Sequence, residues 1–279
     1  MGVCLVGLSG VVLSTLGVGI RQIEAASGWQ ILFYRSLSFI VTLCLIIALR
    51  YRSNFFRAFS HIGSRGLLVG LFLACASSLY VFSMLNTTVA NAVFMVSTTP
   101  FVAAALGWML LKERVGPSTW IAMTVALAGI GLMLVDGFSG GGLIGVVLAA
   151  GVAVTTALML VAVRGSQEID MIPALVVAGA ITAALSALMV TDFQVTDHDL
   201  LWIVVLGAGQ YACGFALLTA GARYLPVAQV GLLCLMETVL APVWAWWGAA
   251  EVPSMLTLIG GIVVLGAAGS RAWTALREQ

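Results

Sequence analysis

The chain has 279 residues, of which 8% are charged and 62% are hydrophobic. Soluble domains carry about 25% charged residues, so this composition excludes a soluble globular protein. It indicates a polytopic membrane protein with almost no part outside the lipid bilayer. No stretch has the composition of a nucleotide-binding domain, and we expect no nucleic-acid partner.

Apolar runs follow one another along nearly the whole chain. A hydrocarbon core of ~30 Å needs about 20 apolar residues per helix. On this basis we predict an all-α membrane protein with ten transmembrane helices, at residues 2–20, 29–49, 66–85, 88–111, 118–135, 143–163, 171–190, 200–221, 227–248 and 254–273. Most connections are short, which makes neighbouring helices antiparallel. The longest polar connection, residues 50–65, is rich in Phe and Arg and is predicted to lie along the membrane surface.

The basic residues separate cleanly in this ten-span arrangement. Of the 12 Lys and Arg residues, ten lie on one side, Arg21 lies on the other, and Arg35 falls inside span 29–49. The positive-inside rule then places both termini in the cytoplasm. We expect a multi-pass protein of a bacterial plasma (inner) membrane, and because ten spans can enclose a cavity alone, a monomer suffices.

The two halves of the chain resemble each other when shifted by 138 residues. Trp108 then aligns with Trp246, and Glu113 aligns with Glu251. Each half holds five predicted spans, and since five is odd, the second half crosses the membrane in the opposite sense. The sequence therefore predicts an inverted repeat of residues 1–138 and 143–279, an architecture found in many secondary transporters.

Three segments resemble EamA-type transporters of the drug/metabolite transporter superfamily. They are Thr98-Thr99-Pro100-Phe101 through Lys112-Glu113-Arg114, the run from Glu237 to Trp246, and Phe33-Tyr34-Arg35-Ser36. The likeness extends over essentially the whole chain and, within the superfamily, is to YddG-type bacterial exporters of aromatic and other neutral amino acids. The resemblance implies a ten-helix bundle around a central cavity.

Two ionisable residues lie within predicted spans, where a charge is expensive. Glu237 lies near the middle of span 227–248 and could meet a substrate amine, carry a proton, or serve as a structural carboxylate. Arg35 could pair with Glu237, hold the structure together, or extend its long side chain towards the membrane surface. We favour a structural or surface-directed role for Arg35.

Two prolines fall within predicted spans. Pro100 in span 88–111 and Pro242 in span 227–248 each remove a backbone donor and predict an interrupted or kinked helix. Each could act as a hinge during alternating access, or as a fixed kink that shapes the cavity.

Polar, aromatic and thioether side chains at mid-span could line a central substrate site. The hydroxyls and amides could equally form bonds between helices, and tyrosine rings suit an aromatic or amphipathic solute. Together with Glu237, the candidates are Ser14, Ser77, Tyr80, Ser83, Asn91, Met95, Thr98, Thr99, Thr155, Gln210, Tyr211 and Trp244.

The composition also limits the function classes. The five cysteines all lie in apolar runs, and His61 and His198 are isolated in loops, so we predict no disulfide framework, metal site or cofactor. No catalytic cluster falls within the spans, which argues against an enzyme. We predict a secondary transporter exporting amino acids, including aromatic ones, by alternating access. The alternatives are a carrier for nucleosides, cationic drugs or other metabolites and, less in keeping with the sequence, a channel.

Overall fold

The computed structural model describes residues 1–15, 19–20, 22–52, 55–60, 62–87, 89–134, 142–166, 169–249 and 255–277. Within these ranges all the regular elements are helices, as the composition predicts. Their bounds are α1 (Gly2–Leu13), α3 (Gly28–Tyr51), α4 (Phe55–Ser60), α5 (Gly63–Asn86), α6 (Val89–Val96), α7 (Thr99–Leu111), α8 (Pro117–Leu134), α9 (Leu143–Arg164), α10 (Ile172–Met189), α11 (Asp197–Val205), the π-helix η3 (Leu206–Ala212), α12 (Cys213–Ala222), α13 (Val227–Ala249) and α14 (Met255–Arg277).

Six segments of the described chain are long and apolar enough to cross a membrane. Their mean hydropathies lie between 1.6 and 2.5, and they are Gly28–Tyr51, Gly63–Ser83, Phe94–Leu111, Leu143–Arg164, Ile172–Met189 and Asp197–Ala222. Shorter apolar helices, Gly2–Leu13, Pro117–Leu132, Val227–Leu240 and Leu258–Ser270, fall where the remaining spans are predicted. The fold is therefore that of an all-α, multi-pass membrane protein.

Two predicted spans differ from the structure in their continuity. The span predicted over 88–111 is two helices, α6 and α7, separated at Ser97 and Thr98. Pro100 lies in the first turn of α7, where its missing N–H costs nothing. The span predicted over 2–20 is not one continuous helix, because α1 ends at Leu13, Ser14 and Thr15 form a turn, and residues 19–20 are again helical.

The interruption predicted at Pro242 is absent. α13 runs as one helix from Val227 to Ala249, so the backbone continues through this position. The connection predicted to lie along the surface holds the short helix α4. Glu251 and most of the predicted linker between the halves lie outside the described residues.

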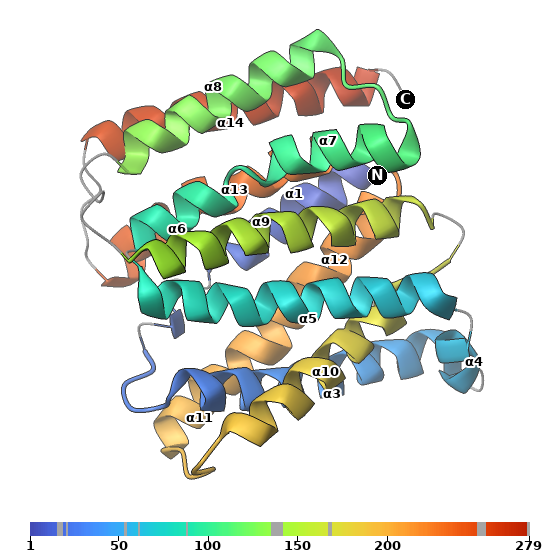
Figure 1. The fold of residues 1–279 in the computed structure, drawn as a ribbon, viewed down its shortest axis with the longest axis vertical. Coiled ribbons are helices and arrows are strands. Elements are labelled where there is room, and N and C mark those ends of the chain that lie inside the picture. The colour runs from blue at the N-terminus through green and yellow to red at the C-terminus, as the bar shows by residue number, and fades with distance from the viewer. Residues whose placement is uncertain are drawn as a thin grey trace.

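The helices pack side by side (Figure 1). At one end of the row α8 lies along α14, and at the other end α3 lies along α10. Between them, α5 packs against α9 and α10, and α7 packs against α9 and α13. α1 packs against α12 and α13, which brings the start of the chain against its last third.

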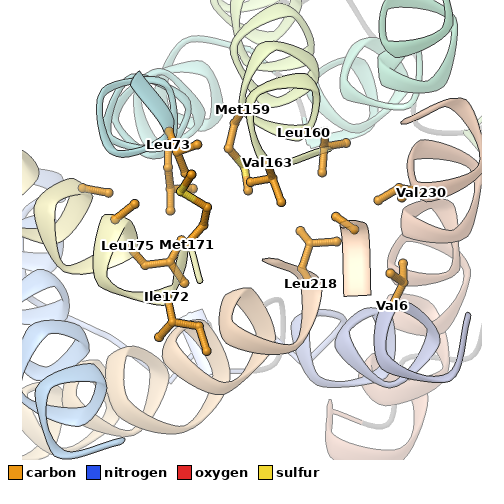
Figure 2. Packing of buried hydrophobic residues seen from close by; sticks show 14 of the residues in the cluster. Val6, Leu73, Met159, Leu160, Val163, Met171, Ile172, Leu175, Leu218 and Val230 are labelled. Carbon is orange, nitrogen blue, oxygen red and sulfur yellow. The ribbon is translucent and has the colours of Figure 1, made fainter. Parts of the chain in front are cut away.

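One end of the bundle is rich in arginine and closed by apolar side chains. There α3, α9 and α12 end, with Arg50, Arg164 and Arg223 beside their last turns. We call it the arginine-rich end. Just inside it, buried side chains from six helices meet (Figure 2), and they include Val6, Leu73, Met159, Leu160, Val163, Met171, Ile172, Leu175, Leu218 and Val230. We call this group the apolar plug.

The opposite end is fastened by hydrogen bonds from the loop between α1 and α3 to the start of α11. The Asp199 carboxylate accepts from the backbone N–H groups of Glu24 at 3.0 Å, and of Ala25 and Ala26 at 2.9 Å each. Asp199 is only 1% exposed. The first and second halves of the chain are thus tied together at this end.

Candidate functional site

Arg35 of α3 is a buried cation. Its side chain is 3% exposed, and its Nη2 donates to the Ser77 hydroxyl of α5 at 2.7 Å. Its Cζ lies 4.5 Å from the centre of the Tyr211 ring, within the range of a cation–π contact. Of the two favoured roles for Arg35, these contacts fit the structural one, and the surface-directed one is wrong because the guanidinium points into the protein. Direct pairing with Glu237 is also wrong, because the described residues contain no ion pair between them.

Tyr211 is positioned by the π-helix η3. Its ring packs between Phe39 at 4.8 Å and Phe215 at 4.6 Å, measured between ring centres. η3 approaches α3 so closely that a Cβ on Gly207 would overlap the Arg35 carbonyl and the Ser38 hydroxyl. A residue without a side chain is needed there, and this contact brings the Tyr211 ring to Arg35. π-helical turns are rare and often occur at functional sites.

Glu237 of α13 faces the same group of residues but has no bonding partner. Its side chain is half-buried, and within the described chain its carboxylate makes no hydrogen bond or ion pair. Tyr80 interacts electrostatically with both Glu237 and Arg35, and Tyr211 does the same. Both tyrosines thus lie within electrostatic range of both charges. We call Arg35, Ser77, Tyr80, Tyr211 and Glu237 the central cluster.

Two candidates fasten α1 to the second half of the chain. The Trp244 indole donates to the Ser14 hydroxyl at 2.7 Å, and the Gln210 amide donates to the Leu13 carbonyl at 2.9 Å. The amide oxygen of Gln210 is buried and accepts no hydrogen bond. Gly10 of α1 lies against α13, where a Cβ would be 3.8 Å from the Glu237 nitrogen. The end of α1 is therefore held beside the central cluster.

The remaining candidates with hydroxyl groups donate hydrogen bonds to backbone carbonyls. Ser83 donates to the Gly145 carbonyl of α9 at 2.9 Å, which is a bond between helices. Thr98 and Thr155 donate to carbonyls one turn earlier, those of Met95 at 2.6 Å and Gly151 at 2.8 Å. Thr99 bonds the Val96 carbonyl in the same way. Met95 is half-buried, and the Asn91 side chain lies outside the described part of the structure.

Pro100 marks the crossing of the two helices that carry the predicted hinges. A Cβ on Gly231 of α13 would lie 2.9 Å from the Pro100 Cα, so α7 and α13 touch there through backbone atoms. The helix break before Pro100 makes α6 and α7 separate units, which a hinge requires. The hinge itself stays a prediction, as does that at Pro242.

An ion pair at the arginine-rich end is a feature that the sequence reasoning missed. Arg164 Nε lies 2.8 Å from Glu113 Oε1, and Arg164 Nη1 donates to the Arg223 carbonyl at 2.7 Å. Glu113 Oε2 accepts from the Val227 N–H at 3.1 Å. The pair joins the ends of α7, α9 and α12 to the start of α13. A signal was present, since Glu113 is an acidic residue between Lys112 and Arg114.

Residues of the kinds that bind metals do not gather in the described structure. Across the ranges given above, no three His, Cys, Asp or Glu side chains come together in a way that could hold a metal ion. The central cluster offers one free carboxylate, one free amide oxygen nearby, and a buried guanidinium beside aromatic rings. Such a set can bind and orient a polar solute.

Comparisons with known proteins agree with this picture. The chain is 26% identical over 280 residues to the pseudopaline exporter CntI of Pseudomonas aeruginosa strain UCBPP-PA14, covering 95% of this chain and 93% of the relative. The same protein of strain PAO1 matches over the same shares at the same identity. A solved crystal structure shares the fold with a TM-score of 0.81 and 21% identity, covering 99% of this chain and 98% of the other.

The sequence profile of one family matches the chain twice. The profile describes the EamA-like transporter family, and it covers residues 1–135 and again residues 143–269. Together with the exporter relatives, this match makes the chain a transporter of small solutes and not an enzyme. The chain belongs to the EamA-like transporter family.

Proposed function

We propose that this protein exports small zwitterionic solutes, amino acids and aromatic amino acids among them, across a bacterial inner membrane as a monomer. The observation that carries the proposal is the central cluster. A solute amine would bind the free Glu237 carboxylate, and a solute carboxylate would approach the buried Arg35 guanidinium. The nearby rings of Tyr80 and Tyr211 suit an aromatic side chain. Relatives named as exporters support the outward direction.

We infer that transport proceeds by alternating access between two inverted halves. The double profile match supports a repeat. The packing of corresponding helices in the two halves supports it as well. α5 packs on α9, and their counterparts in the other half, α12 and α1, also pack on each other. α1 begins at the arginine-rich end, where Gly2 contacts Tyr224, whereas its counterpart α9 ends there. Opposite directions of corresponding helices are what an inverted repeat requires.

The closed end of the structure supports the same mechanism. The apolar plug and the Glu113–Arg164 pair close the arginine-rich end. Glu237, farther into the bundle, is half-buried. If the arginine-rich end faces the cytoplasm, as the positive-inside rule predicts, this is the state closed towards the cytoplasm. Export then requires the plug and the ion pair to separate so that solute can reach the central cluster.

Counterflow in liposomes tests the substrate class. Purified protein would be reconstituted and offered a panel of amino acids, nucleosides and quaternary ammonium cations. We expect exchange of phenylalanine and other neutral amino acids, and weak exchange of N-acetyl-phenylalanine, which lacks the amine, and of phenylalaninamide, which lacks the carboxylate. A preference for quaternary cations over amino acids would contradict the assignment and support a cation carrier, for which Glu237 alone suffices.

A further inference from the structure

A cavity lies at the arginine-rich end, on the far side of the apolar plug from the central cluster. It has a volume of about 200 Å³ and is lined by residues of α1, α3, α9 and α12 and by the residues before α10. The lining includes Leu5, Arg50, Asp170, Thr219, Arg223 and Tyr224. We call it the arginine pocket.

Arg223 brings an uncompensated charge to this pocket. Its Nε is buried and has no hydrogen-bond partner, and its guanidinium makes no ion pair with any residue that the structure describes. The guanidinium carbon lies 5.2 Å from the centre of the Tyr224 ring. The backbone here is fixed, because the Arg223 carbonyl accepts from Arg164 at 2.7 Å. A buried donor without a partner is costly, so an external acceptor would be favoured.

Thr219 supplies a second unused group on the same helix face. It lies in α12 four residues before Arg223, which follows the last residue of that helix with helical backbone angles, so both side chains project towards the same side. The Thr219 side chain is 2% exposed, and its hydroxyl oxygen is buried without a partner. Two independent polar groups, one hydroxyl and one guanidinium, are thus left unpaired against one cavity.

The acidic residue of the pocket is already occupied. Asp170 binds Arg50 at 3.0 Å, accepts from the Tyr51 hydroxyl at 2.7 Å, and accepts from the Ile172 N–H at 3.1 Å. Arg50 and Asp170 therefore compensate each other, and the charge left over belongs to Arg223. A pocket with a free guanidinium, a free hydroxyl and a neutralised carboxylate selects an oxyanion.

We propose that the arginine pocket binds one oxyanion group, the carboxylate of a solute or the phosphate of a lipid headgroup, through Arg223 and Thr219. Its role as a first binding place for solute at the cytoplasmic entrance rests on the proposed export function. Binding itself does not, since it follows from the unpaired groups.

Binding to the full chain in nanodiscs tests the proposal without any transport step. Nanodiscs of phosphatidylcholine would be titrated with phenylalanine and, separately, with inorganic phosphate, and a third set would contain phosphatidylglycerol. The measurement is the midpoint of thermal unfolding as a function of probe concentration. We expect saturable stabilisation by at least one probe, and about tenfold or greater weakening in Arg223→Gln, because a charge-assisted bond is lost.

Three further variants separate binding from folding. Arg223→Lys keeps the charge and should restore part of the affinity, and Thr219→Val should weaken binding less than Arg223→Gln. Arg52→Gln removes an exposed arginine at the same end, outside the pocket, and should leave binding unchanged. Stabilisation by phenylalanine assigns the oxyanion to a solute, and stabilisation by phosphatidylglycerol alone assigns it to lipid.

The proposal is overturned if no probe stabilises the protein, or if Arg223→Gln responds as the unmodified chain does. Counterflow on the same variants keeps this failure apart from failure of the proposed function. Amino-acid exchange without Arg223-dependent binding would reject the pocket and retain the transporter assignment. Arg223-dependent binding without amino-acid exchange would retain the pocket and reject amino acids as the transported solutes.

Discussion

At the scale of single residues, the central cluster contains two opposite charges that do not pair with each other. Arg35 is bound by Ser77 and covered by Tyr211, whereas Glu237 has no bonding partner in the described structure. We therefore expect the two residues to have different roles. Arg35 is held in place by other residues of the protein, whereas the Glu237 carboxylate is available to bind a solute.

Glu237→Gln separates the substrate-binding role from the structural one. We expect counterflow of phenylalanine to fall by about tenfold or more, because a bond between a charged carboxylate and the solute amine is worth about 1.5–3 kcal/mol. Thermal stability should be unchanged or higher, since a costly charge is removed from the bundle. Asp197→Asn, an exposed carboxylate at the start of α11, is the matched control. Unchanged counterflow in Glu237→Gln would reject the binding role.

Ser77 and Ser78 offer a paired test of how Arg35 is held. Ser77→Ala removes the 2.7 Å partner of a buried guanidinium and should lower the free energy of unfolding by about 1.5–3 kcal/mol. Ser78→Ala removes a bond that only returns to the Ala74 carbonyl of the same helix, so its effect should be small. Unfolding in detergent or bicelles measures both. Equal losses in the two variants would show that Ser77 does not hold Arg35.

At the scale of secondary-structure elements, the positions of Tyr211 and Pro100 depend on irregular helices. Tyr211 belongs to η3, and Pro100 begins α7 after the break that follows α6. Irregular turns of this kind recur where transporters bind or bend. The close contacts through Gly207 and Gly231 keep these irregular segments against their neighbours.

Gly207→Ala should disturb the central cluster, and Gly209→Ala should not. A Cβ on Gly207 would overlap the Arg35 carbonyl and Ser38, so we expect a loss of about 1–3 kcal/mol in stability and reduced transport. A Cβ on Gly209, two residues along the same π-helix, meets nothing within 4 Å. Its replacement should be neutral or slightly stabilising, as in other helices. The same sign of change in both variants would contradict the packing argument.

The sequence predicted the helices better than their irregularities. Hydropathy locates α3, α5, α9 and α10 because each is a long apolar run. The π-helix at Leu206–Ala212 follows from packing against α3, which no local pattern encodes. The end of α1 at Leu13 and the division between α6 and α7 likewise depend on neighbouring helices. A proline marks the second case, but a similar proline at position 242 leaves α13 unbroken.

The sequence indicates which residues are candidates for the site, but it does not indicate which of them contact each other. Glu237, Tyr80, Ser77 and Tyr211 stand out because polar groups are rare in apolar spans, and the structure brings them together around Arg35. Which partner each would take depends on contacts between distant parts of the chain. Arg164 and Glu113, 51 residues apart in sequence, could not be paired from spacing alone.

At the scale of the whole molecule, the arginine-rich end is closed by two layers. The apolar plug lies inside, and the pair of Arg164 and Glu113 lies nearer the surface, with side chains 20% and 22% exposed. A partly buried pair is less screened by water than a surface pair, so it contributes more to closure. Opening this end requires both layers to separate.

Arg164→Gln should favour opening at this end. It removes the bonds to Glu113 and to the Arg223 carbonyl, so a cysteine in place of the fully buried Met159 of the plug should react severalfold faster with a maleimide. The five native cysteines would first be replaced by alanine. Arg52→Gln, at the same end and exposed, should not change the rate. Equal rates in the two variants would show that the pair does not hold this end closed.

The bonds from Asp199 to residues 24–26 also determine which mutations the opposite end can tolerate. Asp199 binds the backbone N–H groups of Glu24, Ala25 and Ala26, and none of their side chains takes part in these bonds. In a saturation mutagenesis screen for transport, these three positions should accept nearly every amino acid except proline, which lacks the N–H. Asp199 itself should accept almost none. In the screen, the connection between the two halves would then show as three positions that tolerate substitution and one aspartate that does not.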